Sequence, residues 1–221
     1  MQPVAVRILH PASRSAAGPL ERALGDARAA NAQRLVALFR AAGATDVGIV
    51  SGAPDARSFG ERLRGLIAGL PAGAGLVVLG SGAIPLAMRA DAVALLEVAS
   101  SGVRRALANN VFSADVVAIG AAGNLAAVPN LPSDNALPRW LREHAGFEVS
   151  ALPRPRLQLD LDSPLDVVLA ASVQANAGAE IDGIDTSSVR DRIDRIRRVA
   201  ADPTRQLVVA GRTSAATLTW L

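Results

Sequence analysis

The stretch Gly75-Leu76-Val77-Val78-Leu79-Gly80 places four large aliphatic residues between two glycines. A run this short and this apolar is typical of a strand that is buried on both faces. Comparable runs occur at 4–9, 46–50 and 114–120, and stretches whose apolar residues recur at helical spacing lie between them. This alternation predicts an α/β protein with a three-layer α/β/α architecture and a mostly parallel, twisted sheet.

The predicted helices follow the apolar spacing along the chain. They cover 19–42, 59–70, 90–100, 103–108, 137–145, 164–174 and 188–201. Further strands are predicted at 147–149 and 156–161. The connection 121–138 contains three prolines and is long for a segment without secondary structure, which predicts a functional loop or irregular packing.

Composition excludes several kinds of chemistry. The chain of 221 residues has no cysteine, two histidines and 23 basic residues that are all arginine. Thiolate and multi-histidine metal sites, Schiff-base lysines and the lysine of a P-loop are therefore excluded. A net charge of +3 and 3% aromatic residues also argue against a nucleic-acid partner.

The domain prediction is one α/β domain over 1–175, followed by a helical extension over 176–221 that packs on the same domain. No apolar run reaches the roughly 20 residues needed to cross a bilayer, and no signal peptide is recognised. We therefore expect a cytoplasmic protein without a membrane partner. The apolar end of the chain is interpreted as a truncation, and the oligomeric state is left open, with a homo-oligomer among the alternatives.

Parallel α/β sheets bind ligands at the carboxyl ends of their strands, so the segments that follow each strand are the first candidates. After the first strand, Ser13 and Arg14 lie in a loop of small residues that leads into a helix. Such a loop presents backbone N–H groups to a phosphate, and Arg14 is the expected bidentate phosphate ligand. The alternative is an ordinary strand-to-helix turn.

After the third strand come Gly80, Ser81 and Gly82, where two glycines allow a nucleotide to approach the backbone closely. The alternative is a tight turn of small residues. Neither histidine is near Ser81 in the sequence, so no catalytic Ser–His arrangement is predicted.

Two polar groups complete the candidates outside the last strand. Asn110 is a candidate nucleotide-binding residue, and Ser133, Asp134 and Asn135 are candidate substrate-binding residues, because amides and short acids bind base edges or hydroxyls. The alternative for Ser133 or Asp134 is capping of the helix that follows.

The run Asp160-Leu161-Asp162-Ser163-Pro164-Leu165-Asp166 carries the strongest signal. Alternation along a strand would place Asp160 and Asp162 on one face, where two carboxylates repel unless a cation lies between them. Such a pair suits Mg²⁺ shared with phosphates. Helix capping is an alternative that accounts for Asp162, Ser163 and Asp166 but leaves Asp160 unexplained.

This run resembles the closing motif of the nucleotide-diphospho-sugar transferase superfamily, which has the A-type glycosyltransferase fold. The similarity extends over about 4–173 and is nearest to phospholactate guanylyltransferases, with molybdenum-cofactor nucleotidyltransferases as more distant relatives. The resemblance implies transfer of a nucleoside monophosphate from a nucleoside triphosphate, GTP being favoured, to a small phosphorylated acceptor with loss of pyrophosphate. It also implies Mg²⁺ at Asp160 and Asp162, with Arg14 and Asp160 as the catalytic residues.

The chain departs from that family at two positions. The first loop has no lysine, and the turn 80–86 has no acidic residue, where the family usually has a metal-binding aspartate. Two alternatives follow: a non-catalytic relative that acts as a binding or regulatory module, and a sugar-nucleotide-dependent glycosyltransferase.

Overall fold

The computed structural model of the protein describes residues 2–12, 17–52, 55–125, 127–173, 184–206 and 208. The chain forms two units, Met1–Asp182 and Gly183–Leu221, each described by itself. The second contains helix α6 (Ser187–Ala200), close to the predicted range. Among the described helices, none has the length and apolarity required to cross a membrane. The predicted packing of the extension stays a prediction, and the end of the chain lies outside the described residues.

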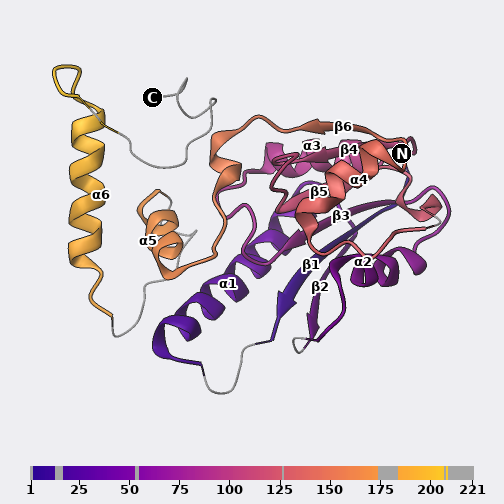
Figure 1. Ribbon diagram of the computed structural model, residues 1–221, viewed down its shortest axis with the longest axis horizontal. Helices are drawn as coiled ribbons and strands as arrows, with labels where there is room; N and C mark the ends of the chain where they lie inside the picture. Colours follow the sequence, from indigo (N-terminus) through magenta and orange to yellow (C-terminus); the bar gives the residue numbers. More distant parts are fainter. Residues whose placement is uncertain are drawn as a thin grey trace. The chain divides into compact units, whose positions relative to one another are not determined.

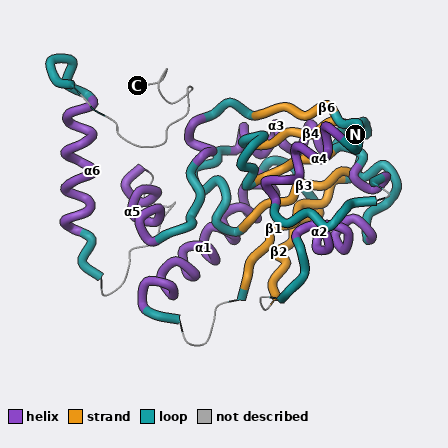
Figure 2. Tube along the Cα trace, in the orientation of Figure 1, coloured by secondary structure: helices purple, strands orange, loops and turns teal. Residues whose placement is uncertain are grey.

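The first unit is built on one six-stranded sheet (Figures 1 and 2). Its strand order is β2-β1-β3-β5-β4-β6, and β5 alone runs antiparallel to its two neighbours. The strands are β1 (Val4–Pro11), β2 (Asp46–Gly52), β3 (Gly75–Gly80), β4 (Arg105–Ala108), β5 (Val116–Ile119) and β6 (Glu148–Ala151). The predicted mostly parallel sheet is thus confirmed.

Helices cover both faces of the sheet. Because side chains alternate along a strand, Val77 and Leu79 join one core cluster, while Leu76 and Val78 join the other. The first cluster contains residues of α1 (Pro19–Ala41) and α3 (Arg89–Ala99), and the second contains residues of α2 (Phe59–Ala68) and α4 (Leu137–Glu143). Helix α5 (Pro164–Val173) packs on α1. The predicted three-layer α/β/α architecture is confirmed.

Two predicted elements are wrong. Residues 103–108 contain good helix formers, yet Arg105–Ala108 is strand β4, because it pairs with both β5 and β6 and is buried between them. The strand predicted at 156–161 is instead the 3₁₀ turn η3 (Pro155–Gln158), followed by a single bridge at Asp160. Pro155 lacks the N–H that a ladder needs, and the neighbouring arginines are held by a buried acid.

The long connection after β5 is packed rather than open. Gly60 of α2 donates its N–H to the Leu131 carbonyl at 3.0 Å, and a Cβ at Gly60 would lie 2.0 Å from the Pro129 oxygen. Arg64 donates to the Val128 carbonyl at 2.6 Å. The loop therefore follows α2 closely, and it carries Asp134 back to the carboxyl edge of the sheet.

A buried ion cluster fixes the segment that leads to Asp160. The Asp91 side chain on α3 is fully buried and accepts hydrogen bonds from the Met88 N–H at 2.7 Å, from Arg156 at 2.7 and 2.8 Å, and from Arg154. Burial works to raise the pKa of Asp91, but these hydrogen bonds together outweigh it and hold the pKa below its usual value. The cluster therefore ties α3 to the turn η3.

We expect Asp91→Asn to lower the free energy of unfolding by about 3 kcal/mol, because it removes the charge that two partly buried guanidinium groups share. The melting temperature should fall by roughly 6–12 °C in a chain of this size. Glu143→Gln is the matched control, because Glu143 pairs with Arg139 on an exposed helix face, where such pairs contribute about 0.5 kcal/mol or less. Equal melting temperatures for the two variants would contradict this role of Asp91.

Candidate functional site

The turn that follows β3, here called the glycine turn (Gly80–Gly82), lies at the carboxyl edge of the sheet between β1 and β5. Ser81 donates its N–H to the Leu9 carbonyl of β1 at 2.8 Å. Asn31 on α1 is 3% exposed, and its amide donates to the Ser81 carbonyl at 2.8 Å and to the Ala83 carbonyl at 3.0 Å. One buried side chain thus holds the backbone on both sides of Gly82.

A second side chain of α1 continues this support. Arg34 donates to the Ile84 carbonyl at 2.9 Å, to the Ala87 carbonyl at 3.1 Å and to Asn31 Oδ1 at 3.1 Å. Burial lowers the pKa of Arg34. Ile84 has a φ of 43°, in the left-handed region that β-branched residues rarely adopt. Strain of this kind persists only where the surroundings hold the backbone in place, and Arg34 and Asn31 provide that hold.

The acidic run meets the glycine turn directly. Asp160 forms a backbone bridge with Ala83, and Leu161 donates its N–H to the Gly82 carbonyl at 3.1 Å. A Cβ at Gly82 would lie 2.7 Å from Asp160 Oδ1, so only glycine fits there without displacing the carboxylate. Two segments that are far apart in the sequence therefore form one wall of the site.

Arg28 fixes the other side of the same run. Its Nε donates to the Leu161 carbonyl at 2.6 Å, and its Nη2 pairs with Asp162 at 3.0 Å. Arg28, Asn31 and Arg34 recur every three residues, so they project from one face of α1. That face of α1 is the floor that supports the site.

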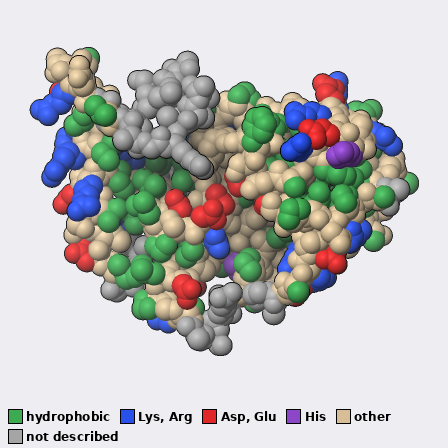
Figure 3. Space-filling model, viewed as in Figure 1, with side chains coloured by type: hydrophobic (Ala, Val, Ile, Leu, Met, Phe, Trp, Pro, Cys, Tyr) green, Lys and Arg blue, Asp and Glu red, His purple; other side chains and the backbone are tan. Residues whose placement is uncertain are grey.

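Four aspartates line a common cavity, here called the acidic pocket. It has a volume of about 190 Å³ and is lined by the glycine turn, Arg28, Asp115, Asp134, Asp160 and Asp162. Figure 3 shows acidic side chains gathered beside a hollow near the centre of this face. Asp115 precedes the antiparallel strand β5, and that direction brings it to the carboxyl edge. A carboxylate therefore lies beside the turn 80–86, which has no acidic residue of its own.

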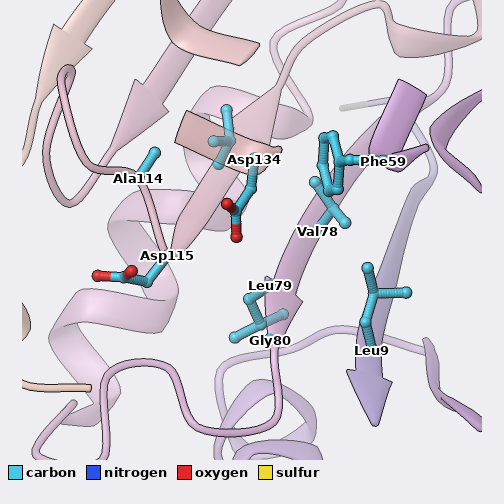
Figure 4. A pocket seen from close by; sticks show the side chains of 9 residues that line it. Leu9, Phe59, Val78, Leu79, Gly80, Ala114, Asp115 and Asp134 are labelled. Carbon is cyan, nitrogen blue, oxygen red and sulfur yellow. The ribbon is translucent and has the colours of Figure 1, made fainter. Parts of the chain in front are cut away.

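Asn109 positions Asp115. The Asn109 side chain is buried, donates to Asp115 Oδ2 at 2.7 Å and to the Leu157 carbonyl at 2.9 Å, and accepts from the Asp115 N–H at 3.0 Å. A smaller adjoining cavity of about 150 Å³ is lined by Asp115, Asp134 and Gly80 together with apolar side chains. In Figure 4 the Asp134 side chain points from its loop toward the end of β3.

The four carboxylates influence one another electrostatically. Burial, followed by the charges of Asp162 and Asp115, raises the pKa of Asp160 to about 7. Burial also raises the pKa of Asp115 and of Asp134, and the charge of Asp162 adds to both shifts. Negative charge thus exceeds positive charge in the acidic pocket, which favours a cation or a proton there. Within the described ranges, no three His, Cys, Asp or Glu side chains form a metal site by themselves.

A larger groove adjoins the acidic pocket on the β2 side. It has a volume of about 520 Å³ and shares Leu9 and Pro11 with the acidic pocket. The other side chains or backbone that line it belong to His10, Val50, Ser51, Gly52, Asp55, Arg57, Phe59, Arg62, Gly65, Leu66 and Pro132. Asp55 pairs with Arg57 at 2.7 Å and with Arg62 at 2.6 Å.

The structure brings together some of the predicted site residues and not others. Gly80, Ser81, Gly82, Asp134, Asp160 and Asp162 all line the acidic pocket. Ser13 and Arg14 lie outside the described residues. Asn110 does not line either cavity or the groove, because its side chain accepts from the N–H groups of Phe112 and Ser113 and donates to Gln158.

Helix capping was the alternative role for several of these polar residues, and the hydrogen bonds show which of them cap. Asp166 accepts from the Ser163 N–H at 2.7 Å and from its hydroxyl at 2.8 Å, as expected for the start of α5. Ser133 makes no capping bond to the short turn that follows it, and Asn135 donates its N–H to Asp134. Capping thus accounts for Ser163 and Asp166, whereas Asp134 and Asp160 are in the acidic pocket.

Sequence reasoning missed Arg28, Asn31, Asp115 and a contact of Ser81. His10 Nδ1 lies 3.0 Å from Ser81 Oγ, although the residues are 71 positions apart. The absence of a histidine near Ser81 in the sequence was therefore misleading. The usable signal was that His10 and Ser81 both follow strands that the alternation pattern makes parallel.

A carboxyl group whose pKa is raised by folding holds its proton more tightly than in the unfolded chain, so its ionisation destabilises the protein. For Asp160 this loss occurs as the pH rises from 3.8 to about 7. We expect the melting temperature to be higher at pH 5.5 than at pH 8 by about 3 °C or more, the shift that roughly 1 kcal/mol produces.

Asp160→Asn should reduce this pH dependence and should melt at a higher temperature than the wild type at pH 8. Glu148→Gln, at an exposed residue of β6, is the control and should leave the dependence unchanged. If Asp160→Asn kept the full dependence, Asp160 would not be its source.

No model of a known protein family matches the sequence, and no curated protein matches it. A crystal structure from Desulfovibrio desulfuricans G20, whose name assigns it provisionally to the nucleotide-diphospho-sugar transferases, matches with a TM-score of 0.52 and 14% identity. That match covers 90% of this chain and 98% of the other.

A second structure, Rv0371c from Mycobacterium tuberculosis H37Rv, has a TM-score of 0.42 and 14% identity, over 76% of this chain and 96% of its own. At 14% identity the first match concerns the fold. The mostly parallel six-stranded sheet with flanking helices is the architecture that this match covers. The chain therefore has the nucleotide-diphospho-sugar transferase fold, as the acidic run at 160–166 predicted.

Proposed function

We propose that the protein is a nucleotidyltransferase that transfers a nucleoside monophosphate group, GTP being the favoured donor, to a small phosphorylated acceptor and releases pyrophosphate. One observation carries the proposal: Asp160 and Asp162 are joined through the backbone to the glycine turn at the carboxyl edge of the sheet. This is the edge at which α/β sheets bind nucleotides. The preference for GTP rests on the family resemblance alone.

The groove beside the acidic pocket supports a nucleotide ligand by its size and lining. Its volume of about 520 Å³ lies in the range of roughly 300–1,000 Å³ that is typical of small-molecule sites. Val50, Phe59 and Leu66 offer apolar surface for a base. Because the groove and the acidic pocket share Leu9 and Pro11, a base in the groove would leave the phosphates next to the aspartates.

The donor set of the acidic pocket fits Mg²⁺. Mg²⁺ prefers oxygen ligands and usually takes one or two carboxylates together with phosphate oxygens and water. Asp160 and Asp162 would hold it. Burial, followed by the charges of Asp162 and Asp115, raises the pKa of Asp160, and a cation bound there would favour the ionised carboxylate. When bound, Mg²⁺ neutralises charge on the phosphates and orients them.

The transfer itself needs little covalent chemistry from the protein. An oxygen of the acceptor phosphate forms a bond to the α-phosphorus, and the bond to the bridging oxygen of the β-phosphate breaks, so pyrophosphate leaves with that electron pair. A phosphate acceptor is already ionised near neutral pH and needs no base. The residues of the chain therefore act by positioning and by charge: the glycine turn allows close approach, Arg28 holds Asp162 in place, and Arg14 is the predicted phosphate ligand.

The measurements described below also test two alternative functions. A sugar-nucleotide-dependent glycosyltransferase is favoured by the name of the structural neighbour, and it would release a nucleoside diphosphate instead of pyrophosphate. A non-catalytic relative was suggested by the missing acid in the turn 80–86. Asp115 weakens that alternative, because it brings a carboxylate to the same turn from another strand.

We expect GTP to raise the melting temperature in the presence of Mg²⁺ and to have little effect without it. At a hundredfold excess over the dissociation constant, the gain of about 2.7 kcal/mol corresponds to roughly 5–10 °C. A thermal-shift panel of four nucleoside triphosphates and of nucleotide sugars, each with and without Mg²⁺, measures this. Release of pyrophosphate or of a nucleoside diphosphate then distinguishes the two transferase reactions.

Asp160→Asn should abolish the Mg²⁺-dependent shift, whereas Glu148→Gln should retain it. The proposal is refuted if no nucleotide or nucleotide sugar at millimolar concentration changes the melting temperature of the wild-type protein.

A further inference from the structure

We infer that His10 is a ligand-binding residue, held by Ser81 so that its second ring nitrogen meets a phosphate group at the junction of the groove and the acidic pocket. The inference rests on the proposed function, and it adds a residue that neither the acidic run nor the first loop contains.

The position of His10 places it at that junction. It is the penultimate residue of β1 and lies in register with Ser51 of β2, and both residues line the groove. Its neighbours Leu9 and Pro11 line the groove and the acidic pocket alike. A ligand that extends from the groove into the acidic pocket along Leu9 and Pro11 would therefore lie beside His10.

Ser81 holds the imidazole in a fixed orientation. Ser81 is 2% exposed, its N–H donates to Leu9 and its carbonyl accepts from Asn31. Its hydroxyl lies 3.0 Å from His10 Nδ1. Because the serine is buried and its backbone is fixed at both groups, it acts as a positioning residue rather than as a nucleophile, and it leaves Nε2 of His10 for another partner.

The charges around His10 explain why an anion would bind there. Of the arginines that line the groove and the acidic pocket in the described part of the chain, Arg57 and Arg62 pair with Asp55, and Arg28 pairs with Asp162. Binding a phosphate to any of them competes with an existing ion pair. His10 contacts a neutral hydroxyl instead, so its imidazole can donate to a phosphate oxygen without breaking a salt bridge.

The acidic residues nearby determine that the anion must bind together with a cation. Asp115, Asp134, Asp160 and Asp162 lie beyond Ser81 in the acidic pocket and would repel a bare anion. A phosphate that arrives with Mg²⁺ carries the charge that those carboxylates require. The ligand class is therefore a Mg²⁺-bound polyphosphate, of which a nucleoside triphosphate is one form and inorganic tripolyphosphate another.

The chain has two histidines, so the imidazole signals of His10 can be compared with those of a single internal control, His144. The imidazole nitrogens of the full-length protein labelled with ¹⁵N-histidine are observed by NMR while Mg²⁺-tripolyphosphate or Mg²⁺-GTP is added. We expect the signals of His10 to shift on binding and those of His144, at the end of α4, to stay. Ser81→Ala should change the His10 signals in the ligand-free protein, because it removes the partner of Nδ1.

Affinity provides the second measurement. His10→Ala should weaken binding of Mg²⁺-GTP by about tenfold or more, the loss typical of a hydrogen bond to a charged group. His10→Gln, which keeps an N–H donor, should recover part of that loss, and His144→Ala should bind like the wild type. Melting temperatures of the ligand-free variants show whether each remains folded.

Each outcome bears on one proposal or on both. If Mg²⁺-GTP binds while His10 signals stay fixed and His10→Ala binds normally, the role of His10 is refuted and the proposed function stands. If Mg²⁺-tripolyphosphate shifts the His10 signals and Mg²⁺-GTP binds no more tightly than tripolyphosphate, the role of His10 is supported and the proposed specificity for a nucleotide is refuted. If neither ligand binds at millimolar concentration, both proposals are refuted.

Discussion

The site depends on one buried amide. Asn31 hydrogen-bonds the two carbonyls that flank Gly82, and through them it sets the distance between helix α1 and the end of β3. An unsatisfied buried amide would cost free energy comparable to a lost hydrogen bond, so the turn and the helix can pack only in this relation. The turn held by Asn31 fixes the position of Ser81, which contacts His10. It also fixes the segment at Asp160, which pairs with Ala83.

The order of elements could be predicted from the sequence because it depends on local patterns. Continuous apolar runs such as 75–80 are recognisable as buried strands, and helical spacing marks the helices between them. The two wrong elements, 103–108 and 156–161, are short segments whose state is decided by partners. Strand β4 exists because β5 and β6 lie on either side of it, and η3 exists because Asp91 holds the arginines around Pro155.

The candidate site could be predicted in part, for a related physical reason. Because ligands bind at the carboxyl ends of strands, the sequence predicts site residues at both Gly80–Gly82 and Asp160. The structure joins the two segments through their backbones, although Asp160 follows a 3₁₀ turn and not a strand. Asp115 was missed because the direction of β5 is not a local property of its sequence. Arg28 was missed because it reads as the solvated face of a long helix, although its guanidinium reaches Leu161 and Asp162.

The reversed direction of β5 couples the chemistry of the site to the length of a hairpin. The chain enters the carboxyl edge at Asn109 and leaves it at Asp115, so the two ends of this loop are fixed: Asn109 positions Asp115, and Asp115 lines the acidic pocket. A shift of one residue in the register of β5 would turn every side chain of this strand to the opposite face. The length of this loop is therefore constrained by the sheet and by the acidic pocket together, and Asn110 holds its backbone by accepting from the N–H groups of Phe112 and Ser113.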